Sequence, residues 1–175
     1  PRRAVPGMAP LDESLTRMRV HPGDLDLYRH VNNGVYLQMM DVARINLIAD
    51  LGIARELIER GWYPVVAAST MSYKRSLTLG QRFEVRSRVL GWDARCAYLE
   101  QRFVRPDQTG SPEVYARAVV RDTILKKSGG VVKVDEIAAA AGVSISDFDL
   151  PEQLRTWGFA SRLPSTRDAA PSVWA

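Results

Sequence analysis

The feature that most constrains this fold is one strongly apolar helical segment followed by a long run of strand-like segments. Residues 34–51 carry two adjacent stripes of apolar side chains at helical spacing, so that few faces of the helix are polar. The first stripe contains Val35, Met39, Val42 and Ala49, and the second contains Tyr36, Met40, Ala43 and Leu47. From residue 65 the period of the pattern changes to two. The sequence therefore predicts an α+β fold in which an antiparallel sheet wraps around one long, largely buried central helix.

The strand-like segments are expected at 14–20, 65–77, 81–90, 96–104 and 113–127, with a short helix at 54–60. Short turns join the last four, which predicts a four-stranded meander. We expect a flexible N-terminal arm over 1–13, the wrapped domain over 14–127, and a C-terminal extension over 128–175 made of a helix (134–141) and an irregular tail. A sheet of this kind leaves two open edges, which favours dimerisation by edge pairing.

Composition excludes several classes of protein. The formal net charge of the chain is +4. Cys96 is the single cysteine, so an internal disulfide and a multi-cysteine metal site are excluded. The two histidines and the cysteine are widely scattered, and no metal is expected. No apolar run has the length of a membrane span and no secretory signal is visible, so a cytoplasmic location is expected.

The tail contains a segment, 134–144, that is similar to the first half of a helix-turn-helix motif. The residues that would form its recognition helix include Asp147, Asp149 and Pro151. Acidic side chains repel phosphates and proline interrupts a helix, so nucleic acid is not an expected partner.

A polar loop before the central helix carries the densest set of reactive groups: Asp24, Asp26, His30, Asn32 and Asn33. The first N–H groups of a helix have no partner within it and lie at the positive end of its dipole, so they can stabilise an oxyanion. A carboxylate beside them can act as a nucleophile or as a general base on water. These are the parts needed for acyl transfer to water, although Asp and Asn before a helix also serve commonly as caps and turn formers.

The segment DLDLYRHVNNGVYLQMMDVAR (24–44) resembles the signature of hot-dog-fold thioesterases of the 4-hydroxybenzoyl-CoA type. The stretches YKRSLTLGQRFEVRSRVLGWD (73–93) and YLEQRFV (98–104) are most similar to the thioesterase superfamily member-six-like branch. The resemblance covers about residues 14–127. It implies a hot-dog fold and hydrolysis of an acyl-CoA or acyl-carrier-protein thioester, with CoA as part of the substrate and no bound cofactor. It also implies a homodimer or homotetramer, because the pocket of this fold usually lies between two subunits.

The resemblance also implies roles for individual residues. In GDLD (23–26) it assigns the catalytic carboxylate to Asp26, and it assigns the N–H that polarises the thioester carbonyl to Asn33. His30 would position Asp26 or the water, or act as the base. In the related plant enzymes an Asn stands two residues after the Asp, where this chain has Tyr28, so the resemblance does not carry an Asn-assisted mechanism over to this chain.

Asp41, in the middle of the helix, is the alternative carboxylate, and its other interpretation is an ion pair with Arg44. Asp50 in the last turn is a weaker candidate, and Cys96 is a remote candidate for a nucleophile. Substrate-binding candidates are assigned to three places: Tyr28 and Asn32 in the loop, Tyr36 and Met40 along the helix for the acyl group, and Tyr73, Lys74 and Arg75 for the CoA phosphates, with Arg82, Arg86 and Arg88 as a further basic stripe.

Two other functions stay open at this point. A hot-dog hydratase or dehydratase would also use an Asp/His pair, and a non-catalytic acyl-CoA-binding protein would keep the pocket without turnover.

Overall fold

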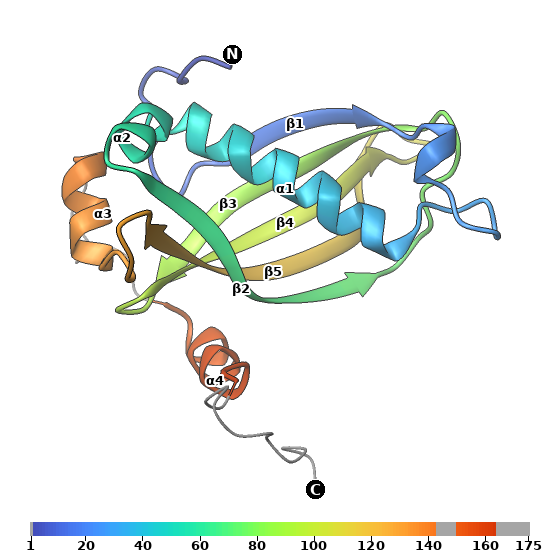
Figure 1. Cartoon of the computed structure of the whole chain (residues 1–175). Helices are drawn as coiled ribbons and strands as arrows, with labels where there is room; N and C mark the ends of the chain where they lie inside the picture. The colour runs from blue at the N-terminus through green and yellow to red at the C-terminus, as the bar shows by residue number, and fades with distance from the viewer. Residues whose placement is uncertain (1, 143–149, 164–175) are drawn as a thin grey trace, which may run out of the picture.

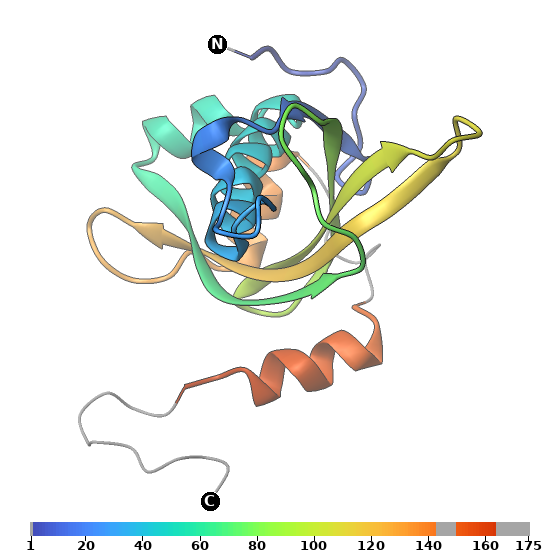
Figure 2. The same ribbon diagram turned by 90° about the vertical axis from the view of Figure 1, so that its right-hand side faces the viewer.

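The computed structural model describes residues 2–142 and 150–163. Its strands are β1 (Ser14–Arg19), β2 (Trp62–Tyr73), β3 (Arg82–Trp92), β4 (Cys96–Pro106) and β5 (Pro112–Lys126). Its helices are the short 3-10 turn η1 (Pro22–Asp24), α1 (Asn33–Asp50), α2 (Ala54–Glu59), α3 (Val134–Ala141) and α4 (Glu152–Ala160). The strands form one sheet that curls around α1, as Figures 1 and 2 show.

α1 begins and ends where local signals place it. The side chain of Asn32 accepts a hydrogen bond of 2.8 Å from the N–H of Gly34, which caps the first turn. At the other end, Gly52 follows the helix with a positive φ of 76°, a conformation that glycine adopts without strain. The predicted central helix is therefore confirmed to within one residue at each end.

The core forms between one face of α1 and the concave face of the sheet. From α1 it takes Tyr36, Met39, Met40, Ala43 and Leu47, and from the sheet it takes Phe83, Val85, Leu99, Phe103, Ala116, Ala118 and Val120. The Tyr36 and Phe103 rings pack edge to face with centroids 4.9 Å apart. The opposite face of α1 leaves Leu37, Val42 and Ile45 exposed within this single chain, so the helix is less fully surrounded than its apolar pattern predicts.

The strand order is β1-β3-β4-β5-β2, and the pairs are antiparallel. β3, β4 and β5 form a meander, but β2 pairs with β5 rather than with β3, so the predicted four-stranded meander is wrong. The chain between Tyr73 and Arg82 crosses the open end of the sheet, past the start of α1 (Figure 1). This crossing is what closes the sheet around the helix.

β2 also differs from its expected bounds, since it starts three residues earlier and ends four residues earlier. Pro64 lies inside it, where a strand was not expected. β2 is an edge strand, and proline is tolerated at an edge because the missing N–H need not serve a second neighbour.

The N-terminal arm is docked rather than loose in the described residues. Arg2 forms an ion pair of 2.5 Å with the buried Asp50, and the N–H of Val5 donates to the carbonyl of the same residue at 2.9 Å. Met8 packs against the core. These contacts tie the arm to the end of α1.

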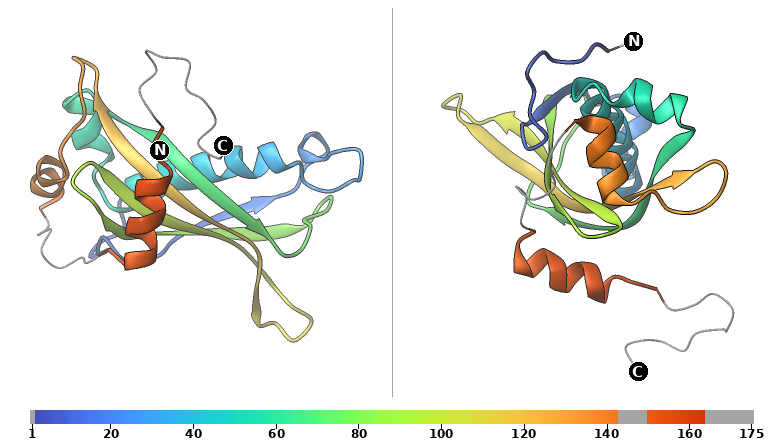
Figure 3. Two further views of the ribbon diagram at one scale, coloured as in Figure 1. Left: turned by 90° about the horizontal axis from the view of Figure 1, so that it is seen from below. Right: turned by 90° about the vertical axis from the view of Figure 1, so that its left-hand side faces the viewer.

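The C-terminal extension packs on two places. α3 covers the end of the sheet where α1 ends, through a cluster that includes Trp62 and Val132 (Figure 3, right). α4, which the sequence did not predict, packs Leu154 and Trp157 against Tyr98 on the outer side of β4. The predicted helix 134–141 coincides with α3, whereas Asp147 and Asp149 lie outside the described residues. Within the described ranges, none of the helices combines the length and the hydropathy needed to cross a bilayer.

Candidate active site

The polar loop folds into a small hairpin at the N-terminal end of α1. The N–H of Asp26 donates to the carbonyl of His30 at 2.8 Å, and Leu25 pairs with Val31. The N–H of Asn32 donates to the carbonyl of Asp24 at 2.8 Å. These bonds hold the loop against the start of the helix, so Asp26 and Asn33 belong to the same end of the molecule.

The carboxylate of Asp26 is held by the backbone of its own hairpin. Its Oδ1 accepts hydrogen bonds from the N–H groups of Tyr28 at 2.8 Å and His30 at 3.1 Å. Among the described residues, its Oδ2 has no hydrogen-bond partner. One oxygen is therefore fixed and the other is available to an incoming group.

The first turn of α1 offers a free donor at the same end of the molecule as this carboxylate. The side chain of Asn32 occupies the N–H of Gly34, while the carbonyl of Asn32 accepts from Val35 and Tyr36. The N–H of Asn33 has no acceptor within the described chain. It lies in the first turn of an 18-residue helix, at the positive end of its dipole.

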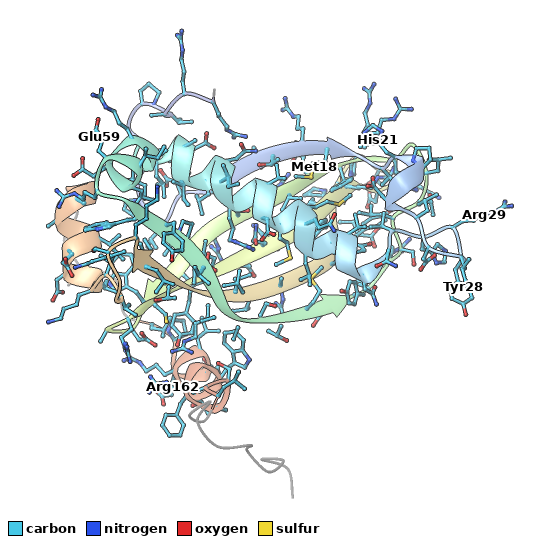
Figure 4. All side chains as sticks on the ribbon, viewed as in Figure 1. Met18, His21, Tyr28, Arg29, Glu59 and Arg162 are labelled. Carbon is cyan, nitrogen blue, oxygen red and sulfur yellow. The ribbon has the colours of Figure 1, made fainter. Side chains whose placement is uncertain are left out.

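His30 and Tyr28 are both exposed. His30 contributes its backbone to the hairpin and pairs with Thr78, while its imidazole makes no hydrogen bond among the described residues. Tyr28 is 81% exposed at the tip of the loop, next to Arg29, whose φ is +61° (Figure 4). Within one chain, therefore, neither side chain closes over Asp26.

Tyr36 and Tyr73 join the start of α1 to the end of β2. Their rings pack edge to face with centroids 5.2 Å apart, and the N–H of Leu77 donates to the hydroxyl of Tyr36. Burial raises the pKa of Tyr36, so its hydroxyl stays protonated. Tyr36 and Met40 are core residues whose side chains are almost fully buried.

Lys74 and Arg75 follow Tyr73 and share one acidic partner, Glu113, at 3.8 and 2.9 Å. Tyr73 and Lys74 also line an open basic groove with Arg88, Arg102 and Arg117 on the sheet face turned away from α1; Glu100 is part of the same lining. Of the predicted arginine stripe, Arg86 pairs with Glu84, Arg88 pairs with Glu100, and Arg82 lines a separate groove at the β1 edge.

The alternative candidates for the catalytic group are held by structural contacts or are buried. Asp41 forms the expected ion pair with Arg44, and Asp50 is buried between Arg2 and Ser14. Cys96 is buried, and this burial raises the pKa of its thiol, which disfavours the nucleophilic thiolate.

Sequence reasoning missed a buried polar cluster halfway along α1. Arg44 donates to Gln101 at 3.0 Å and lies 3.4 Å from Asp122, and Gln101 donates to the carbonyl of Met40 and the hydroxyl of Ser87. Burial raises the pKa of Asp122 to about 6, against a smaller opposite effect of Arg44. The signal available in the sequence was a charged residue inside an apolar helix, which in the core must find partners.

The described residues contain no group of three or more His, Cys, Asp or Glu side chains placed to hold a metal ion.

Comparison with known proteins gives the family. A family model described as the thioesterase-like superfamily matches residues 20–157. Protein THEM6 of Danio rerio is 40% identical over 94 residues, which cover 54% of this chain and 46% of that protein. Protein THEM6 of Xenopus laevis is 42% identical over 85 residues, covering 49% and 41%. The chain thus spans about half the length of these curated relatives.

A crystal structure of a 4-hydroxybenzoyl-CoA thioesterase mutant, complexed with 4-hydroxybenzoyl-CoA, superposes with a TM-score of 0.66 at 16% identity. The match covers 73% of this chain and 98% of that one. It confirms the predicted hot-dog fold, and the THEM6 relatives confirm the predicted similarity to that branch. On the match over residues 20–157, this chain belongs to the thioesterase-like superfamily.

Proposed function

We propose that the protein is an acyl-CoA thioesterase with Asp26 as its catalytic carboxylate. The observation that carries this proposal is that the open Oδ2 of Asp26 and the unpaired N–H of Asn33 lie at the same end of the molecule, where the hairpin joins the start of α1. Membership of the superfamily and the CoA thioester bound by the superposed thioesterase support the substrate class.

In the proposed reaction the thioester carbonyl oxygen accepts a hydrogen bond from the N–H of Asn33. This donor and the helix dipole stabilise the negative charge that develops on the oxygen. The Oδ2 of Asp26 either attacks the carbonyl carbon or removes a proton from the attacking water. The carbon–sulfur bond then breaks, and the products are the carboxylic acid and the free CoA thiol.

His30 is proposed to position the water, because its imidazole is exposed and its backbone is bonded to Asp26. The basic groove is the proposed site for the CoA phosphates. Tyr73 lines this groove and contacts Tyr36 at the start of α1, so the groove reaches the same end of the molecule as Asp26.

We further propose a homodimer formed by antiparallel pairing of β2 with its copy. α1 runs opposite to β2, since Tyr36 meets Tyr73 at one end and Ile48 and Pro64 line the same groove at the other. That groove, which Arg44 and Asp122 also line, lies at the end of α1 and the start of β2. A two-fold axis at the middle of β2 would place the end of one β2 next to the start of the other. The start of one α1 would therefore lie beside the groove at Arg44 of the other chain. This arrangement supports a site completed by the second chain, where the exposed Tyr28 would gain neighbours.

The test is a panel of acyl-CoAs assayed for free thiol with the wild type and with Asp26→Asn. Loss of the general base or nucleophile should lower kcat by about 10²-fold or more, while binding of acyl-CoA by calorimetry stays within a few fold. Asp41→Asn is the matched control, because Asp41 pairs with Arg44, and it should keep kcat within about tenfold of the wild type.

An unchanged rate in Asp26→Asn would remove Asp26 from the mechanism. Binding of acyl-CoA by the wild type without thiol release would favour a non-catalytic binder, and addition of water to enoyl-CoA would favour a hydratase.

A further inference from the structure

An apolar cavity lies at the opposite end of α1 from Asp26. Its volume is about 160 Å³, and its walls come from the second half of α1, the sheet, the N-terminal arm and α3. α3 contributes Val134, Ile137 and Ala138, and it covers the end of the sheet where α1 ends (Figure 3, right). We name this space the α3 cavity, because a helix outside the wrapped sheet closes it.

The cavity opens on the side of α1 that faces β2. Four residues line both the α3 cavity and the open groove between α1 and β2: Arg44, Ile48, Pro64 and Asp122. These four belong to α1, β2 and β5, so α3 forms a wall away from this entrance. The groove adds Ile45 and Val65 as further apolar side chains, so an apolar chain lying in the groove can continue into the cavity.

In the proposed homodimer this entrance faces the reactive end of the other chain. The start of one α1, with the N–H of Asn33, would lie beside the groove at Arg44 of the other chain. Within one chain, by contrast, Asn33 and Arg44 are 11 positions apart in α1, which is about 16 Å along the helix axis. The cavity of the other chain is therefore the nearer one for a thioester held at Asn33.

The size and walls of the cavity limit the group that can enter. A cavity of about 150 Å³ with apolar walls holds one benzene molecule, so the α3 cavity has room for about six carbons at the end of a chain. Its charged residues, Arg44 and Asp122, are those that it shares with the groove. A charged group deeper in the cavity would lose its water without gaining a partner, so the end of the chain must be uncharged. An aromatic ring bonded directly to the thioester carbonyl would stop in the groove.

We propose that the α3 cavity of one chain binds the end of the acyl group whose thioester is held at Asp26 of the other chain. The substrate is then the CoA thioester of an aliphatic acid longer than about six carbons, since the cavity holds about that number and more cross the groove. This inference rests on the proposed function and on the proposed dimer. Ala138 is the specificity-determining residue, because its small side chain, 5% exposed, leaves the cavity open beneath α3.

The first test measures binding without hydrolysis. S-alkyl-CoA thioethers, from butyl to hexadecyl, keep the CoA group and the chain but have no thioester carbonyl. Calorimetry with the full chain should show the affinity rising about fourfold for each further CH₂ that enters the cavity, and falling once the cavity is full. Acyl-CoAs of the same lengths should show the same dependence in kcat/KM, and benzoyl-CoA should be a poor substrate.

Variants of α3 locate the effect. Ala138→Phe fills the cavity and should weaken S-decyl-CoA by about tenfold or more, while S-butyl-CoA, which ends in the groove, keeps its affinity within a few fold. Ala139→Phe, on the exposed side of the same helix, should change neither. Ile137→Ala enlarges the cavity and should move the preferred chain length up by about two or three carbons, a gain that loss of folding cannot produce.

A mixed dimer tests which chain supplies the cavity. Co-expressed Asp26→Asn and Ala138→Phe chains with different tags give a dimer in which one site combines an intact Asp26 with an open cavity from the other chain. That dimer should hydrolyse decanoyl-CoA at about half the wild-type rate, because one of its two symmetric sites is intact. Each variant alone should be at least about tenfold slower than the wild type on this substrate.

The outcomes separate this proposal from the proposed function. Affinity for S-decyl-CoA that is undiminished in Ala138→Phe, or a preferred length that is unchanged in Ile137→Ala, would overturn the cavity as the acyl site. A mixed dimer no faster than Ala138→Phe alone would overturn supply by the other chain. Absence of thiol release with every acyl-CoA would instead overturn the proposed function, and the thioether affinities would still test the cavity.

Discussion

Asp26 and Asp122 are two aspartates beside the same helix, and their surroundings differ in kind. Asp26 lies in a partly exposed hairpin and receives two backbone N–H bonds on one oxygen. Asp122 is buried next to Arg44, and desolvation outweighs the attraction of the arginine. The first environment suits a carboxylate that reacts, whereas the second makes ionisation costly.

Stability should therefore depend on pH through Asp122. Burial raises the pKa of Asp122 from 3.8 to about 6, so the folded protein holds this proton more tightly than the unfolded chain. The resulting stabilisation is complete below about pH 3.8 and is lost as the pH rises through about 6. Asp122→Asn stays neutral throughout, so at pH 8 it should be more stable than the wild type by up to about 3 kcal/mol.

Urea unfolding at pH 4.5, 6 and 8 measures this difference. The two proteins should converge toward pH 4.5, where Asp122 carries its proton in the folded wild type. A difference that stays constant over the three pH values would contradict the raised pKa. Two charged neighbours act on the pKa of Asp122: Arg44 lowers it and Asp41 raises it.

At the scale of the element, the two edges of the sheet are unlike each other. β1 has six residues and carries Arg17 and Arg19, and such short, charged edges resist pairing with other chains. β2 has twelve residues, contains no charged side chain, and leaves Tyr63, Val65, Val66 and Tyr73 exposed. Only β2 therefore has the length and composition that favour pairing with a copy of itself.

Lysines on β2 should break the proposed dimer. The double variant Val66→Lys/Thr70→Lys places two charges from each chain on strands that would lie side by side, and like charges across strands are destabilising. Light scattering coupled to gel filtration should show a dimer for the wild type and a monomer for the variant. Leu15→Lys on the other edge is the control and should leave the dimer intact; a wild type that is monomeric contradicts the proposal.

At the scale of the whole molecule, three segments outside the wrapped sheet pack against it: the N-terminal arm, α3 and α4. The arm docks through Arg2 on Asp50, α3 covers the end of the sheet where α1 ends, and α4 lies on the outer side of β4 (Figures 1 and 3). α4 approaches so closely that a Cβ at Gly158 would lie 1.8 Å from the hydroxyl oxygen of Tyr98. Glycine is thus required there by contact with another element and not by the helix itself.

Gly158→Val should displace α4 from the sheet. Valine favours a helix over glycine, so any loss of stability must come from the clash, and overpacking of this kind costs about 1–3 kcal/mol. We expect a lower Tm and faster tryptic cleavage at Arg155 and Arg162. Ala160→Val, at an exposed position of the same helix, is the control; equal Tm values and cleavage rates for the two variants would contradict the close packing.

The sequence alone determined the features that depend on neighbouring residues. The bounds of α1 follow from Asn32 and Gly52, the existence of the strands follows from their period of two, and the hairpin around Asp26 is a short-range structure within 24–33. The motif over 24–44 was enough to indicate the fold and the family, and Asp26 as the catalytic carboxylate remains a prediction.

Only the tertiary structure decided what depends on distant residues. Whether β2 pairs with β3 or β5 is a choice between similar strands, and the local pattern of each strand is compatible with both. The contacts of Arg44 with Gln101 and Asp122 join residues 57 or more positions apart. The packing of α3 is also long-range, since Ile137 packs against a cluster that includes Leu57 of α2 and Trp62 of β2. The burial that raises the pKa of Asp122 comes from these long-range contacts, because desolvation depends on everything that packs around a group and not on its neighbours in sequence.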